Sequence, residues 1–121
     1  MKEIVFVGTG GFIGASLRYI ASTWFSQFPR FGFPLGTFAV NFIGCTLSGI
    51  FVGLGLGKTT TLPLREFATI RILGGFTTFS AFGLESFGLL KSGQLAMALI
   101  YTLGSMVFGL SGIGLGIFIT R

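Results

Sequence analysis

The sequence predicts an all-α membrane protein in which four transmembrane helices cross the bilayer and the third is broken near the membrane centre. Charged residues make up 9% of the 121 residues and hydrophobic residues 51%, and the mean hydropathy is +0.90. Soluble domains carry about 25% charged residues, so this chain lacks the surface that a soluble fold needs. Two further observations support the predicted fold: the spacing of the apolar segments, and a cluster of helix-weakening residues in the third segment.

Four apolar segments follow one another, each close to the roughly 20 residues that a helix needs to span a bilayer. Short polar joins separate them, and none is long enough to hold a second domain. We therefore expect residues 1–121 to form a single four-span domain. The approximate segments are Ile4 to Phe25, Pro34 to Leu56, Phe67 to Leu90 and Leu95 to Thr120.

The third segment is weakened by the run Gly74-Gly75-Phe76-Thr77-Thr78. Glycine and β-branched residues both lower helix stability, and this run stands where a spanning helix should be strongest. A helix that opens here frees backbone groups, which lipid tolerates only where they are buried in protein or line a cavity. Freed carbonyls suit a small hard cation, whereas freed N–H groups and hydroxyls suit an anion.

Two aromatic residues and one amide are candidates for an anion path. Phe79 and Phe82 are one helical turn apart and point the same way, and the positive edges of their rings can face an anion. Core or lipid contact is the ordinary role of such a pair. Asn41 lies inside the second segment, where an amide is costly unless it meets a partner or water. An interhelical hydrogen bond and a pore contact are both open for it.

Other polar residues inside the segments are functional candidates by default, because they are costly in a membrane. Arg71 and Glu85 stand near the two ends of the third segment, where they either snorkel to the interfaces or serve a function. The remaining candidates are Arg18, Thr37, Ser48, the cluster of Thr77, Thr78 and Ser80, Tyr101, Ser105 and Ser111.

The chain has few of the residues that catalysis uses. It contains no His, so Ser80 has no imidazole base, and no two carboxylates are placed for acid–base chemistry. The single Cys45 lies in an apolar run, which gives no support to a disulfide framework or a metal cluster. We therefore predict that the protein is not an enzyme.

The formal net charge of +5 comes from 8 Lys and Arg against 3 Asp and Glu. The basic residues are scattered at segment ends, which indicates anionic lipid headgroups rather than nucleic acid as their partner. Four spans place both termini on one side, and the Lys/Arg bias that orients a membrane protein is then small, so insertion in both orientations is permitted. One face would carry Lys2, Lys58, Arg65 and Arg121, and the other Arg30 and Lys91.

Most of the 21 glycines lie inside the spans. Several have the small-xxx-small spacing that lets helix backbones approach closely. Together they indicate a compact bundle and an oligomer. These sets are Gly10/Gly14, Gly49/Gly53/Gly57 and Gly112/Gly116.

Three motifs together resemble the small bacterial and archaeal fluoride channels, the Fluc or CrcB-type family. The order and spacing of the motifs and the total length agree, and the resemblance covers essentially the whole chain. The second and third motifs are the specific ones. The motifs are GGFIGASLRY at Gly10–Tyr19, GTFAVNFIG at Gly36–Gly44 and GGFTTFSAF at Gly74–Phe82.

This resemblance implies an antiparallel dual-topology homodimer in the cytoplasmic (inner) membrane of a prokaryote, with two fluoride pores. It implies a structural sodium ion at the dimer centre, held by the backbone carbonyls of Gly74 and Thr77 from each subunit. Ala81 and Gly109 stand where polar residues are expected, so the polar track should be shorter or differently hydrated here. The pore residues that the resemblance implies are Asn41, Phe79, Phe82, Ser80, Tyr101, Ser105, Glu85 and Arg18.

The function that the resemblance implies is a fluoride-selective channel, through which cytoplasmic fluoride leaves passively down its electrochemical gradient. One alternative is a small dual-topology proton-coupled multidrug exporter. It needs a titratable carboxylate deep in a span, and Glu85 is the sole candidate. A second alternative is a purely structural membrane assembly protein, which would need neither the threonine break nor Asn41.

Overall fold

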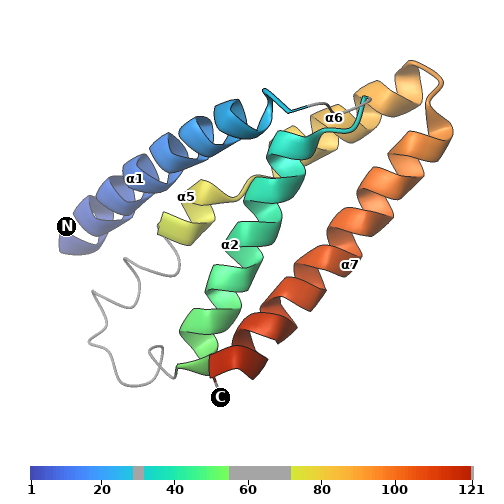
Figure 1. Ribbon diagram of the computed structural model, residues 1–121. Helices are drawn as coiled ribbons and strands as arrows, with labels where there is room; N and C mark the ends of the chain where they lie inside the picture. The colour runs from blue at the N-terminus through green and yellow to red at the C-terminus, as the bar shows by residue number, and fades with distance from the viewer. Residues whose placement is uncertain (29–31, 55–71, 121) are drawn as a thin grey trace.

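The computed structural model of the chain describes residues 1–28, 32–54 and 72–120 (Figure 1). The regular elements among these residues are all helices, as predicted. The start of the predicted third segment lies outside the described residues. So do the predictions made on Arg30, Gly57, Lys58, Arg65, Arg71 and Arg121.

Three of the helices are long and apolar enough to cross a membrane: α1 (Lys2–Phe25), α2 (Leu35–Gly53) and α7 (Leu95–Thr120). They confirm the first, second and fourth predicted segments to within a few residues, and α7 has the predicted bounds. Gly93 has a φ of 81° in the turn before α7, a left-handed conformation that favours glycine. The chain is therefore a multi-pass membrane protein.

The third segment contains two helices, α5 (Gly74–Phe76) and α6 (Phe79–Lys91). Between them Thr77 has φ −83° and ψ 158°, and Thr78 has φ −146° and ψ 126°. Both residues are thus extended, and the helical backbone is interrupted within the glycine–threonine run.

The helices pack as neighbouring pairs (Figure 1). Helix α1 lies against α5 and α2, and α2 lies along α7, which also contacts α6. The N- and C-termini lie at the ends of α1 and α7 that face away from the α1–α2 and α6–α7 connections (Figure 1). The interruption between α5 and α6 is thereby placed beside α2, which contacts both of these helices.

Glycines allow the closest of these contacts. A Cβ at Gly14 would collide with the Ile72 carbonyl and the Phe76 N–H across the α1–α5 contact. A Cβ at Gly116 would lie 2.6 Å from the backbone nitrogen of Ile50 across the α2–α7 contact. Gly10, Gly49 and Gly112 are buried as well. The predicted close packing of small residues is confirmed.

Hydroxyl side chains inside the helices donate to a carbonyl one turn earlier, which is how a span tolerates them in lipid. Ser48 belongs to this group, so its hydroxyl is satisfied within α2. The donor–acceptor pairs are Thr9–Val5, Thr46–Phe42, Ser48–Gly44, Ser86–Phe82, Thr102–Ala98 and Thr120–Gly116.

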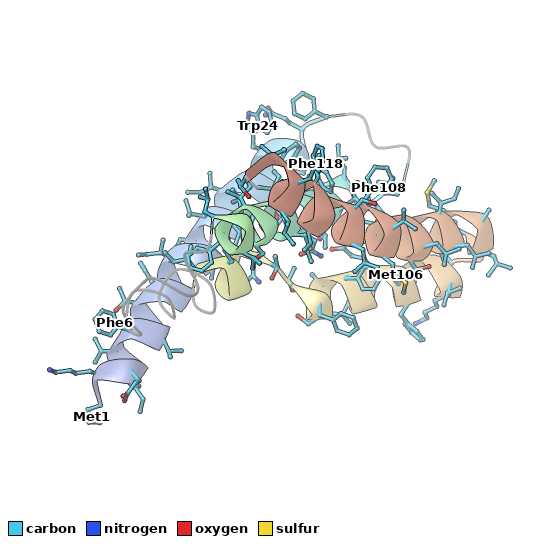
Figure 2. All side chains as sticks on the ribbon, turned by 90° about the horizontal axis from the view of Figure 1, so that it is seen from below. Met1, Phe6, Trp24, Met106, Phe108 and Phe118 are labelled. Carbon is cyan, nitrogen blue, oxygen red and sulfur yellow. The ribbon has the colours of Figure 1, made fainter. Side chains whose placement is uncertain are left out.

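The buried core of the described residues is small, and their outer faces are apolar. Val40 and Tyr101 are the largest fully buried side chains. Trp24 and Phe118 point away from the ribbon (Figure 2) and are 54% and 79% exposed. Surfaces of this kind are expected to contact lipid or a partner chain.

We expect Gly116→Ala to destabilise the α2–α7 contact by about 1–3 kcal/mol, the usual cost of overpacking, because the atoms in the way belong to the backbone. Gly114→Ala is the matched control, since a Cβ there meets nothing within 4 Å, and it should be neutral or stabilising by up to about 1 kcal/mol. Thermal unfolding of the purified proteins in one detergent measures both. Equal changes in Tm would contradict the packing described for α2 and α7.

Candidate functional site

One side chain of α2 holds the interruption between α5 and α6. The Nδ2 of Asn41 donates to the Thr78 carbonyl oxygen at 3.0 Å, and the Thr78 N–H donates to Asn41 Oδ1 at 2.9 Å. The amide thus makes the two-bond pairing that a neighbouring strand would make with an extended residue. Of the two roles that the sequence left undecided for Asn41, the structure therefore contains the interhelical hydrogen bond. An amide nitrogen carries two N–H groups, so one remains for a further acceptor.

The hydroxyl of Thr78 caps α6. Thr78 Oγ1 accepts the N–H of Ala81 at 3.3 Å, as an N-cap residue does. The same oxygen lies 3.3 Å from Ser80 Oγ. The side chain of Thr78 therefore connects the start of α6 with the exposed Ser80 hydroxyl.

The carbonyls of Gly74 and Thr77 are left free. In a continuous helix they would accept from the N–H groups of Thr78 and Ala81, but side chains take those two donors here. Among the described residues, no hydrogen bond reaches either carbonyl oxygen. Gly74 is exposed and Thr77 is half-buried. Free carbonyls at the end of a half-helix are ligands of the kind that a small hard cation uses, so the predicted pair fits such an ion.

An open groove of about 440 Å³ runs beside the interruption, between α2, α6 and α7. It brings together four of the predicted pore residues: Asn41, Phe79, Phe82 and Ser105. We call it the phenylalanine groove. Its other lining residues are Cys45, Ser48, Thr77, Thr78, Thr102, Met106, Gly109 and Ile113.

The two phenylalanines differ in environment. Their ring centroids are 5.7 Å apart, and the Phe82 ring also lies 5.2 Å from that of Tyr101. Phe79 is 82% exposed, so its ring has one free side. An exposed aromatic ring beside an interrupted backbone requires lipid, a partner or an ion to face it.

The hydroxyl of Ser105 has no hydrogen-bond partner among the residues that the structure describes. Its Oγ is a buried side-chain atom without a hydrogen bond from or to the described residues, although a buried hydroxyl is costly when unpaired. Beyond it, a Cβ on Gly109 would stand 3.5 Å from Cys45 Sγ. The groove wall past Ser105 is therefore formed by a thiol and a glycine, in line with the departure noted at Gly109.

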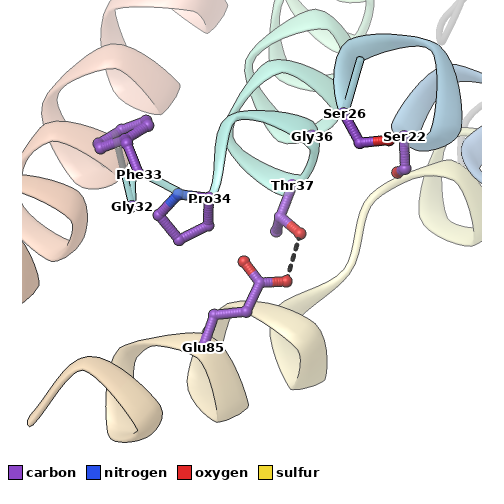
Figure 3. Close-up of a pocket in the computed structure, with 8 residues that line it drawn as sticks. All are labelled: Ser22, Ser26, Gly32, Phe33, Pro34, Gly36, Thr37 and Glu85. Carbon is purple, nitrogen blue, oxygen red and sulfur yellow. Dashed lines mark hydrogen bonds between the residues drawn. The ribbon is translucent and has the colours of Figure 1, made fainter. Parts of the chain in front are cut away.

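The carboxylate of Glu85 joins three helices. Thr37 Oγ1 of α2 donates to Glu85 Oε1 at 2.7 Å (Figure 3), and the Tyr101 hydroxyl of α7 donates to Oε2 at 3.1 Å. Thr37 and Tyr101 are both buried. Glu85 therefore serves as a fixed acceptor inside the bundle, in place of the interfacial snorkelling that its position in the segment permitted.

Two further grooves continue the polar surface. One of about 690 Å³ contains Glu85, Thr37 and Ser22 (Figure 3). The other, of about 350 Å³, contains Arg18 and Ser80 and shares Thr37 and Ser22 with the first. Thr78 lines both this second groove and the phenylalanine groove. The predicted site residues are thus divided among three adjoining grooves, and Tyr101 is buried behind Glu85 and Phe82.

The sequence analysis named Thr37 and Thr78 as candidates but gave neither a partner, and it did not name Ser22. Thr78 precedes an apolar helical run, and a threonine in that place is a helix-capping signal. Ser22 follows Arg18 by four residues, which places both on one helix face. The partner of Thr37 gave no such signal, because it depends on how α2 and α6 are rotated against each other.

Comparisons with known proteins cover nearly the whole chain. Residues 5–117 match the family model described as CrcB-like protein, Camphor Resistance (CrcB). The chain is 41% identical to the "Fluoride-specific ion channel FluC" of Phocaeicola vulgatus, over 100% of both chains. It is 44% identical to the protein of that name from Chloroflexus aurantiacus, over 96% of each chain. It is 42% identical to the one from Helicobacter pylori, over 93% of this chain and 88% of the relative.

We expect Tyr101→Phe to destabilise the protein by about 1–3 kcal/mol, because it removes one of the two hydroxyl donors to the half-buried Glu85 carboxylate. Tyr19→Phe makes the same chemical change on a side chain that is 73% exposed, and it should have little effect. The difference in Tm between the two variants in one detergent measures the contribution of the Glu85 network. A Tyr101→Phe protein as stable as Tyr19→Phe would show that the network adds nothing.

Proposed function

The chain belongs to the CrcB-like family, and from this premise we propose that it is a fluoride-selective ion channel through which cytoplasmic fluoride leaves passively down its electrochemical gradient. The observation that carries the proposal is full-length similarity, at 41–44% identity, to relatives named fluoride-specific ion channels. We propose a channel and not an enzyme, in the cell membrane of a prokaryote.

The chemistry of the phenylalanine groove supports this proposal. A pore must replace the water around a strongly hydrated anion with donors that also release it. Asn41 has one N–H left beyond its bond to Thr78, and Ser105 has an unpartnered hydroxyl among the described residues. The rings of Phe79 and Phe82 can add their positive edges. Among the described residues, no cationic side chain lines this groove, so none of them would trap the anion there.

The other predicted pore residues have supporting roles in this proposal. Arg18 attracts anions from the adjoining groove without standing beside the rings. Ser80 offers a hydroxyl on the same side. Glu85 and Tyr101 fix the packing behind Phe82 and keep the polar surface continuous toward Thr37.

We propose that two such chains form an antiparallel dual-topology homodimer, with the third helix of each broken near the membrane centre. The extended Thr77 and Thr78 between α5 and α6 support the break. The 82% exposure of Phe79 and the open side of its groove support a partner that completes the wall. The outward apolar faces supply surface for both the second copy and lipid.

We further propose a structural sodium ion at the dimer centre. The carbonyls of Gly74 and Thr77 would hold it, one pair from each subunit. Sodium would supply positive charge to backbone oxygens that, among the described residues, have no other partner, and it would thereby stabilise the dimer.

The proton-coupled exporter is less well supported. It would use Glu85 to exchange protons against a cationic substrate. Both oxygens of that carboxylate already accept hydroxyl hydrogen bonds from Thr37 and Tyr101. Release of fluoride from liposomes that required a proton gradient and an organic cation would favour the exporter over the channel.

Purified protein in liposomes should release fluoride when a membrane potential drives it, with chloride far behind. We expect Phe79→Ile, Phe82→Ile and Asn41→Ala each to slow fluoride efflux at least about tenfold, which corresponds to about 1.4 kcal/mol of barrier. A fluoride electrode measures the efflux. Phe118→Ile is the matched control, because Phe118 is 79% exposed but lies outside the groove. Near-normal flux in all three groove variants would refute the pore assignment.

We expect Gly74→Leu to prevent dimerisation while the helical content of the protomer is retained. A Cβ at Gly74 meets no described residue within 4 Å, so we attribute the expected defect to contacts with the partner or the shared ion. Light scattering coupled to gel filtration measures the mass, and circular dichroism measures the helix content. Gly8→Leu, also without contacts within 4 Å, is the control. An intact Gly74→Leu dimer with unchanged ion dependence counts against the proposed site.

A further inference from the structure

We propose that Thr78 is a positioning residue for the cation site. The Thr78 hydroxyl and the Asn41 amide oxygen take the two N–H groups that would otherwise satisfy the carbonyls of Thr77 and Gly74, and so keep these carbonyls free for the ion. The inference rests on the proposed sodium site, and it adds the side chains that create its ligands.

The helical hydrogen-bond pattern stops at a defined residue. The N–H of Thr77 still donates to the Leu73 carbonyl at 3.0 Å, one full turn back. The next donor in this series is the N–H of Thr78, and its helical acceptor would be Gly74. That N–H instead donates to Asn41 Oδ1 at 2.9 Å. The amide oxygen thus substitutes for the Gly74 carbonyl.

The same substitution recurs three residues later. The helical acceptor of the Ala81 N–H would be the Thr77 carbonyl, but Thr78 Oγ1 accepts this N–H at 3.3 Å. Two side-chain oxygens therefore replace two backbone carbonyls one for one. The carbonyls so released, those of Gly74 and Thr77, are the pair that the family resemblance implies as cation ligands.

This exchange links the extended backbone to ion binding. If either side-chain oxygen is removed, an N–H group loses its partner, and in lipid it must find another. The acceptor that a continuous helix would offer is the carbonyl of Gly74 or Thr77, which would then no longer be available to a cation. An ion that binds only the form with free carbonyls stabilises that form. Loss of the Thr78 hydroxyl should therefore weaken the response to sodium.

Variants of Thr78 test the positioning role more directly than variants of Asn41 do, because Asn41 is also proposed as a pore donor. Thr78→Val removes the Oγ1 acceptor and keeps the shape of the side chain. Thr78→Ser keeps the hydroxyl and removes a methyl group, so it is the conservative rescue variant. The two differ in the hydrogen bond to Ala81.

The experiment measures the Tm of the purified protein in detergent against sodium concentration, with N-methyl-D-glucamine as the replacement cation at constant ionic strength. Loss of one hydrogen bond of about 1.4 kcal/mol corresponds to about a tenfold change in affinity. We therefore expect Thr78→Val to raise the sodium midpoint about tenfold, and Thr78→Ser to stay within about twofold of the unmodified protein. Asn41→Leu should raise the midpoint as well, through the Gly74 carbonyl.

An unchanged sodium midpoint in Thr78→Val overturns the inference, and so does an equal shift in Thr78→Val and Thr78→Ser. A Tm of the unmodified protein that does not respond to sodium overturns both the inference and the proposed ion site. If Thr78→Val fails to fold, Asn41→Leu gives the result in its place. Fluoride efflux is measured separately on the same preparations. Absence of efflux with an intact sodium response would overturn the channel proposal alone.

Discussion

The pairing of the Asn41 amide with the backbone of Thr78 holds two extended residues between two helices, where lipid offers backbone groups no partner. The other local features depend on it. α6 can begin at Phe79 because Thr78 is extended and free to act as its cap. The rings of Phe79 and Phe82 face a groove, and not a continuous helix surface, because the chain changes direction there. A Cβ at Gly44 of α2 would collide with the side chain of Thr77, so this glycine lets α2 approach the third segment closely enough for the amide to reach.

The sequence was sufficient to predict what depends on composition and local propensity. The bounds of α7 were predicted to the residue, since Leu95 to Thr120 is uncharged and flanked by a polar turn. The weak point between Gly74 and Thr78 followed from residue types alone. The partners of Asn41 and Glu85 could not be predicted, because a hydrogen bond between helices depends on their relative rotation. The division of Arg18 and Asn41 between separate grooves is a tertiary property for the same reason.

A single copy of the chain leaves three kinds of group without a partner among the described residues. Phe79 is exposed, the hydroxyl of Ser105 lacks a partner among the described residues, and the carbonyls of Gly74 and Thr77 accept no hydrogen bond from them. Each of these groups is costly in a membrane unless something faces it. In the proposed assembly, a second copy, an anion and a cation would together provide what these three kinds of group lack. The proposed assembly therefore explains the exposed ring, the unpaired hydroxyl and the free carbonyls together.

The position of Asn41 in α2 also limits how this chain can change over evolutionary time. One residue of an α-helix corresponds to about 100° of rotation. A one-residue insertion or deletion between Leu35 and Asn41 would rotate one part of α2 against the other. Either Asn41 or Thr37 would then face away from its partner on the third segment. Lineages should therefore accumulate length differences in the joins between spans, and only substitutions in the first turns of α2. In related sequences, the positions of insertions and deletions would then lie outside the first turns of α2, because Asn41 fixes the rotation of this helix.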